Sequence, residues 1–134
     1  MEVKLLQRRR ILIMGVLIVD DSKFMRNIII EILERNNIKV TGEATNGKEA
    51  VSMYKKLKPD VVTMDLTMRE MTGIEAVREI VKIDPKAYII VCSAMGQQEI
   101  IKEAIKEGAK GFVIKPFDED ELVNEINKAF KLKK

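Results

Sequence analysis

The sequence has no histidine, and its only cysteine is Cys92. Without histidine, the chain cannot build histidine-ligated metal sites, histidine general bases or Ser-His-Asp triads. A lone cysteine cannot form a disulfide within the chain, which excludes a disulfide scaffold and favours a reducing compartment.

Long apolar runs are also missing. The longest, residues 11–19, is about half of the roughly 18 residues that a membrane-spanning helix needs. It ends in Asp20-Asp21 and lacks a small-residue cleavage site, so it does not have the form of a signal peptide either. We therefore expect a soluble, cytoplasmic protein without membrane insertion.

The charge is nearly balanced, with 24 basic and 21 acidic side chains and a net charge of +3. Residues 1–13 alone account for this excess, so the rest of the chain is neutral overall. A nucleic-acid-binding domain usually carries a basic stripe on its folded surface. We therefore expect no nucleic-acid partner.

What the sequence does contain is a regular alternation of strand and helix patterns. Short apolar runs rich in β-branched residues predict buried strands at residues 16–19, 61–64, 88–92 and 111–114, and residues 38–44 predict a more polar strand. Apolar stripes at helical spacing separate them, and these are expected to turn Phe24, Leu57 and Ile105 inward. A chain of 134 residues has room for one domain. We predict an α/β fold, (βα)5, with a doubly wound five-stranded parallel sheet and helices on both faces.

Polar side chains occur where the predicted strands end. Asp20 and Asp21 follow the first strand, Asp65 the third, Ser93 the fourth and Lys115 the fifth. In a parallel sheet the carboxyl ends of the strands meet at one edge, and ligands bind there. A lone Asp-Asp pair is usually only a turn or a helix cap. Because polar groups follow four strands of one sheet, we predict a site.

The residue types of this site indicate metal and phosphate chemistry. Two carboxylates about 4 Å apart repel by about 4 kcal/mol at an effective dielectric near 20. A divalent cation relieves this repulsion, and hard oxygen ligands that leave waters in place suit Mg²⁺ better than Zn²⁺. Lys115 can pair with a phosphate oxygen and Ser93 can donate a hydrogen bond to one. A carboxylate beside Mg²⁺ can also attack phosphorus and form an aspartyl phosphate.

Four ordered motifs carry a resemblance to a known family. They are VLIVDDS at 16–22, VVTMDLTMREMTG at 61–73, IIVCSAMG at 89–96 and GFVIKPF at 111–117. Together they resemble the receiver domains of two-component response regulators, closest to the stand-alone chemotaxis regulators of the CheY type. The resemblance covers residues 14 to about 131 and implies the flavodoxin-like and CheY-like strand order 2-1-3-4-5.

The resemblance implies a role for each acidic site residue. Asp65 is implied to be the phosphoacceptor, which takes its phosphoryl group from a histidine kinase. Asp21 and Asp65 are implied to bind Mg²⁺ together with the backbone carbonyl of Thr67. Asp20 is implied to act largely through a bound water.

The resemblance also implies a switch. Ser93 is expected to move and bond the phosphoryl group, and Lys115 is expected to pair with it from a cis Lys115-Pro116 bond. Phe112 holds the position of the aromatic switch residue of the family. From the sequence alone, Phe112 could equally be an ordinary residue of the strand core.

Two features lie outside the family pattern. Arg69 stands where receiver domains usually have proline, either as an exposed loop substitution or as a positive charge beside the phosphate. Residues 1–13 precede Met14-Gly15, where receiver domains normally begin, so we take 14–134 as the receiver domain. The preceding segment is interpreted as an upstream-start artefact, with a packed helix and a basic partner-binding arm as alternatives.

The resemblance predicts a phosphorylation switch and not an enzyme with its own output. No output domain follows in this sequence, so we expect a monomer whose regulated surface binds another protein. That protein is expected to be a motility motor switch or an adaptor, and a phosphatase is a further expected partner. The alternatives are a phosphorelay intermediate, a Mg²⁺-dependent aspartyl-phosphate phosphohydrolase and a flavodoxin-type flavin carrier. Asp20-Asp21-Ser22 does not match the D-x-D of the phosphohydrolases, and two aspartates would repel a flavin phosphate.

Overall fold

The computed structural model describes residues 15–68 and 71–132. The predicted extension at residues 1–13 and the departure at Arg69 lie outside the described residues. The strands are β1 (Gly15–Val19), β2 (Lys39–Ala44), β3 (Val61–Asp65), β4 (Ile89–Ala94) and β5 (Gly111–Lys115). The helices are α2 (Lys23–Arg35), α3 (Gly47–Leu57), α4 (Gly73–Ile83), α5 (Gln98–Lys106) and α6 (Glu119–Leu132).

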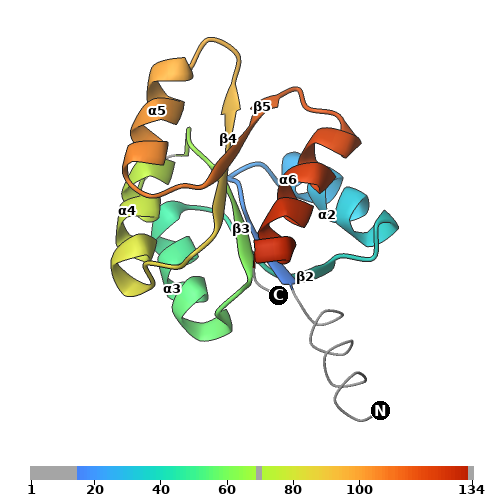
Figure 1. Ribbon diagram of the computed structural model, residues 1–134, viewed down its shortest axis with the longest axis horizontal. Helices are drawn as coiled ribbons and strands as arrows, with labels where there is room; N and C mark the ends of the chain where they lie inside the picture. The colour runs from blue at the N-terminus through green and yellow to red at the C-terminus, as the bar shows by residue number, and fades with distance from the viewer. Residues whose placement is uncertain (1–14, 69–70, 133–134) are drawn as a thin grey trace.

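The five strands form one parallel sheet in the order β2-β1-β3-β4-β5. Helices α3, α4 and α5 cover one face, and α2 and α6 cover the other (Figure 1). Each face has its own apolar core. The core under α3, α4 and α5 includes Leu17, Met64 and Ile80, whereas the core under α2 and α6 includes Ile18 and Leu122. The predicted fold class and strand order are confirmed.

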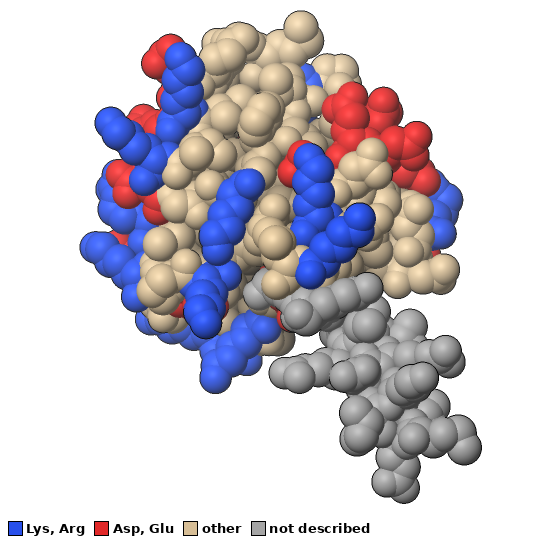
Figure 2. Space-filling model, in the orientation of Figure 1, with Lys and Arg blue, Asp and Glu red and all other residues tan. Residues whose placement is uncertain are grey.

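Local sequence signals fix where the helices begin. The side chains of Ser22, Asn46 and Thr72 each cap a helix by accepting a hydrogen bond from a backbone N–H three residues later. The first turn of α6 carries three carboxylates, which favour the positive end of the helix dipole. These carboxylates contribute to the red patch at the upper right of Figure 2.

The apolar stripes of the helices predicted the wrong burial at three positions. Phe24 is 75% exposed, Ile105 42% and Leu57 38%, although all three were expected to face the sheet. Each lies in the first or last turn of its helix. Periodicity predicts the direction of a stripe but not where the sheet beneath it ends. No helix among the described residues is both long and apolar enough to cross a membrane.

Candidate functional site

Three aspartates meet at the carboxyl edge of the sheet. Asp20 directly follows β1, Asp65 is the last residue of β3, and these two strands are neighbours in the sheet. One carboxylate oxygen from each of Asp20, Asp21 and Asp65 lies within 4.8 Å of the others. Asp20 and Asp65 are buried, whereas Asp21 is exposed. Two carboxylates of this acidic cluster are therefore buried at the edge of the sheet, and the third is exposed to solvent.

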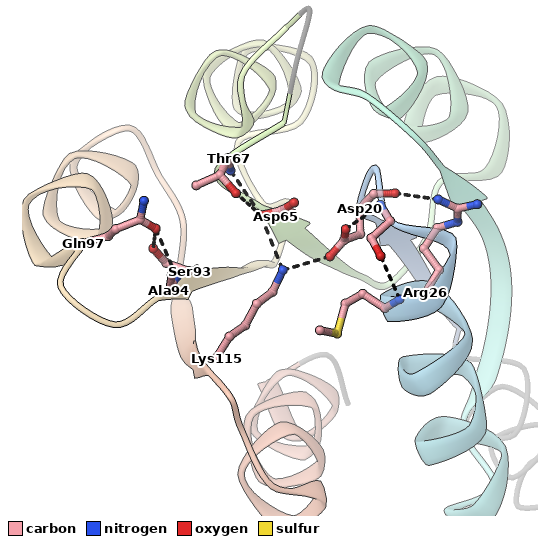
Figure 3. A network of polar contacts seen from close by, with 10 residues as sticks. Asp20, Arg26, Asp65, Thr67, Ser93, Ala94, Gln97 and Lys115 are labelled. Atoms are coloured by element: carbon pink, nitrogen blue, oxygen red, sulfur yellow. Dashed lines mark hydrogen bonds and ion pairs between the residues drawn. The ribbon is translucent and has the colours of Figure 1, made fainter.

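Lys115 supplies the opposing charge. It is the last residue of β5, and its stem reaches across the strand ends toward the cluster (Figure 3). Its Nζ lies 3.0 Å from Oδ2 of Asp20 and 3.7 Å from Oδ1 of Asp65. Burial acts to lower the pKa of Lys115, but the hydrogen bond to Asp20 and the two carboxylate charges outweigh it and raise this pKa above its usual value. The ammonium therefore stays charged at neutral pH. The Lys115-Pro116 bond is cis, as expected.

The loop after β1 is held by contacts that the sequence did not reveal. Ser22 donates its backbone N–H to Oδ1 of Asp20 over 2.9 Å. Arg26 donates from Nη1 to the backbone carbonyl of Asp20 over 2.8 Å and from Nε to Glu43 on β2. The guanidinium thus ties Asp20 to α2 and to β2. Nothing in the sequence distinguished Arg26 from the other basic residues of the helices.

The carboxylate of Asp65 is anchored on one oxygen. Thr67 donates to Oδ1 of Asp65 from its backbone N–H over 3.1 Å and from its hydroxyl over 3.0 Å. Within the described part of the chain, the hydrogen bonds that this carboxylate accepts both fall on Oδ1. This arrangement fixes the orientation of the carboxylate and leaves Oδ2 for another ligand.

Ser93 lies at this edge but is engaged elsewhere. It is buried near the end of β4, and its Oγ donates to Oε1 of Gln97 over 2.7 Å. The same amide oxygen accepts the backbone N–H of Ala94 over 3.0 Å. Figure 3 shows Gln97 and Ser93 on the far side of Asp65 from Asp20. Gln97 was not predicted as a site residue, because a glutamine before a helix carries no chemical signal of its own.

Phe112 and Cys92 have opposite surroundings. Phe112 is 47% exposed on β5, so the reading of this residue as strand core is wrong. Cys92 is buried, and burial raises the pKa of its thiol to about 12 even though the charge of Lys115 acts to lower it. The thiol therefore stays protonated at neutral pH, which agrees with an inert core residue.

The response regulator receiver domain family matches residues 16–127. The chain belongs to this family. The receiver domain is 60% identical over 116 residues to the chemotaxis protein CheY of Thermotoga maritima, covering 87% of this chain and 97% of the relative. It is also 54% identical over 113 residues to CheY of Bacillus subtilis, covering 84% of this chain and 94% of the relative.

A solved structure shares the fold of this receiver domain. It is a CheX-CheY-BeF3-Mg²⁺ complex from Borrelia burgdorferi, with a TM-score of 0.82 and 35% identity over 87% of this chain and 88% of the other. The family match and these relatives confirm the family that the four sequence motifs predicted. CheY-type receiver domains are signalling switches, which favours the switch over the phosphohydrolase and the flavin carrier.

Proposed function

We propose that this receiver domain is a stand-alone, monomeric chemotaxis regulator of the cytoplasm, phosphorylated on Asp65 by a CheA-like histidine kinase. The observation that carries the proposal is the meeting of Asp20, Asp21 and Asp65 within 4.8 Å, with the Lys115 ammonium beside them. The proposed receiver domain comprises residues 14–134, and residues 1–13 are an extension without a role in the site. Phosphorylation is proposed to control binding to a motility motor switch or adaptor protein.

The donor set fits a magnesium ion. Three carboxylates supply hard oxygens at a partly open edge, where waters can complete an octahedral shell. Asp21, Asp65 and the backbone carbonyl of Thr67 are the proposed direct ligands, and Asp20 is proposed to act through water. When bound, Mg²⁺ supplies positive charge to phosphoryl oxygens.

Asp65 is placed to act as the nucleophile. In the proposed step, its free carboxylate oxygen forms a bond to phosphorus while the bond between phosphorus and the kinase histidine nitrogen breaks. Thr67 keeps the other oxygen turned away, and Lys115 pairs with the transferred phosphoryl oxygens. In such a transfer the protein mainly positions the reacting groups and neutralises the charge of the phosphoryl oxygens.

The output surface is proposed to lie on α5, β5 and α6. Ile105 on α5 and Phe112 on β5 are exposed apolar side chains, and so is Met95 in the loop before α5. Ser93 is the penultimate residue of β4, which leads into that loop. In the proposal, Ser93 turns to the phosphoryl group and Phe112 moves inward. An expected further partner is a phosphatase, since a CheY of the same fold is found in complex with CheX.

Phosphotransfer from a purified, radiolabelled chemotaxis histidine kinase tests this function. The label should pass to the receiver domain only with Mg²⁺ present. Asp21→Asn should slow transfer by roughly tenfold or more, because even groups behind a metal ligand typically contribute 10–100-fold. Asp21 is exposed, so this variant should keep its fold. Asp120→Asn, an exposed aspartate on α6, is the matched control and should transfer normally. Undiminished transfer to the wild type without Mg²⁺, or equal transfer to wild type and Asp21→Asn with Mg²⁺ present, would contradict the proposed site.

The switch should be visible in NMR spectra recorded with Mg²⁺ and beryllofluoride. Adding phosphoryl-like charge at Asp65 should draw in Ser93 and Lys115, so backbone shifts should concentrate on α5, β5 and α6. A complete switch from 1:99 to 99:1 requires about 5.5 kcal/mol of differential binding, so we expect a partial shift. Purified motor-switch protein should bind the activated form more tightly. Shifts confined to α2 and α3 would show that the output surface lies elsewhere.

A further inference from the structure

Gln97 holds the hydroxyl of Ser93 in a defined orientation. Its amide atom facing β4 lies 3.0 Å from the backbone nitrogen of Ala94 and 2.7 Å from Oγ of Ser93. A backbone N–H can only donate, so this amide atom must be the oxygen. An amide oxygen can only accept, so Ser93 must be the donor. The Ser93 proton is therefore directed at Gln97 and away from Asp65.

A serine hydroxyl has one proton to donate. The proposed switch requires Ser93 to donate that proton to a phosphoryl oxygen on Asp65. The contact with Gln97 and the contact with the phosphoryl group therefore exclude each other. Inverting the amide of Gln97 would not remove the conflict, because its NH₂ group would then face the N–H of Ala94.

We propose that Gln97 is a positioning residue that latches Ser93 in the unphosphorylated arrangement and so raises the threshold for activation. This inference rests on the proposed function. Gln97 immediately precedes α5, so release of the latch also frees the start of a helix on the proposed output surface. Gly96, with φ at +86°, forms the turn that brings the side chain of Gln97 back onto β4.

Removal of the latch should leave the fold intact. Gln97 is half-buried, and its side chain makes no capping hydrogen bond to α5. Ala94 is exposed, so water can replace the amide oxygen at its N–H. Shortening the side chain of Gln97 to that of alanine is therefore expected to affect Ser93 and not the packing of the core.

The test measures beryllofluoride affinity in the presence of Mg²⁺ by isothermal titration. Gln97→Ala should bind roughly threefold to tenfold more tightly than wild type, because one ordinary hydrogen bond no longer opposes the switch. Gln98→Ala, the neighbouring exposed glutamine, is the matched control and should bind like wild type. In the unliganded protein, the Ala94 amide should exchange with solvent faster in Gln97→Ala than in wild type.

A double-mutant cycle with Ser93→Ala separates latching from a general loosening of the loop. In the Ser93→Ala background, Gln97→Ala should have no effect, since no hydroxyl remains to be held. An unchanged or weaker affinity for Gln97→Ala alone would overturn the latch, and so would a gain that persists without Ser93. Failure of the wild-type protein to bind beryllofluoride would instead overturn the proposed function, and the latch with it.

Discussion

Replacing Asp65 with asparagine is expected to abolish labelling of the protein by a small phosphodonor such as acetyl phosphate. The variant keeps the size of the side chain but removes the charge and the nucleophilic oxygen, so no acyl phosphate can form. Asp20 is also buried beside Lys115, but Thr67 holds one oxygen of Asp65 and leaves the other open, whereas both oxygens of Asp20 already accept hydrogen bonds, from Ser22 and Lys115. Labelling should be followed by mass spectrometry of the intact protein with Mg²⁺ present.

Asp120→Asn is the control for this experiment, because it makes the same chemical change at an exposed site on α6. It should label like wild type. Circular dichroism should show that both variants are folded. Stable phosphorylation of Asp65→Asn on another residue would show that the phosphoacceptor has been wrongly assigned.

Replacing Gly73 with alanine is expected to destabilise the protein by about 1–3 kcal/mol and to weaken Mg²⁺ binding. A Cβ at Gly73, the first residue of α4, would lie 2.3 Å from the carbonyl oxygen of Asp65 and 2.6 Å from Cα of Leu66. Both atoms belong to the backbone that carries the proposed phosphoacceptor, so relief of the clash must move the site. The better helix propensity of alanine returns at most about 1 kcal/mol and does not offset this. Urea unfolding and Mg²⁺ titration measure the two effects.

Gly111→Ala provides a matched control at a second buried glycine. There the added Cβ would approach Oε2 of Glu125, the mobile end of a side chain that can turn away. We expect a loss of less than about 1 kcal/mol and unchanged Mg²⁺ affinity. Equal losses in the two variants would show that contact with the Asp65 backbone is not what makes Gly73 necessary.

The sequence predicted the fold and the acidic cluster because both follow from patterns of nearby residues. Each strand was recognisable from its own short segment, four of them apolar and one more polar, and parallel pairing then placed Asp20, Asp65 and Lys115 at one edge. The observed strands also include Asp65, Ser93 and Lys115 themselves, one or two residues beyond the predicted ends. The ends shifted because backbone pairing continues past the last apolar side chain.

The supporting contacts were not predictable in the same way. Arg26 and Gln97 are ordinary polar residues in the sequence, and their partners depend on side-chain rotamers and loop geometry. Phe24 and Phe112 are large apolar residues, yet both are exposed. The sequence does not show which apolar side chains the packing of helices on the sheet leaves at the surface. The geometry of the candidate site thus includes contacts that local patterns do not encode.

The ion pair between Lys115 and Asp20 joins residues 95 positions apart in the chain. During synthesis on a ribosome, the acidic side chains emerge long before the ammonium that neutralises them. A nascent chain that ends before β5 would hold its buried aspartates without this counter-charge, and it would also lack the edge strand that pairs with β4. The proposed phosphorylation site is therefore complete only after β5 has been synthesised. A fragment that ends before β5 would lack both Lys115 and the strand that pairs with β4.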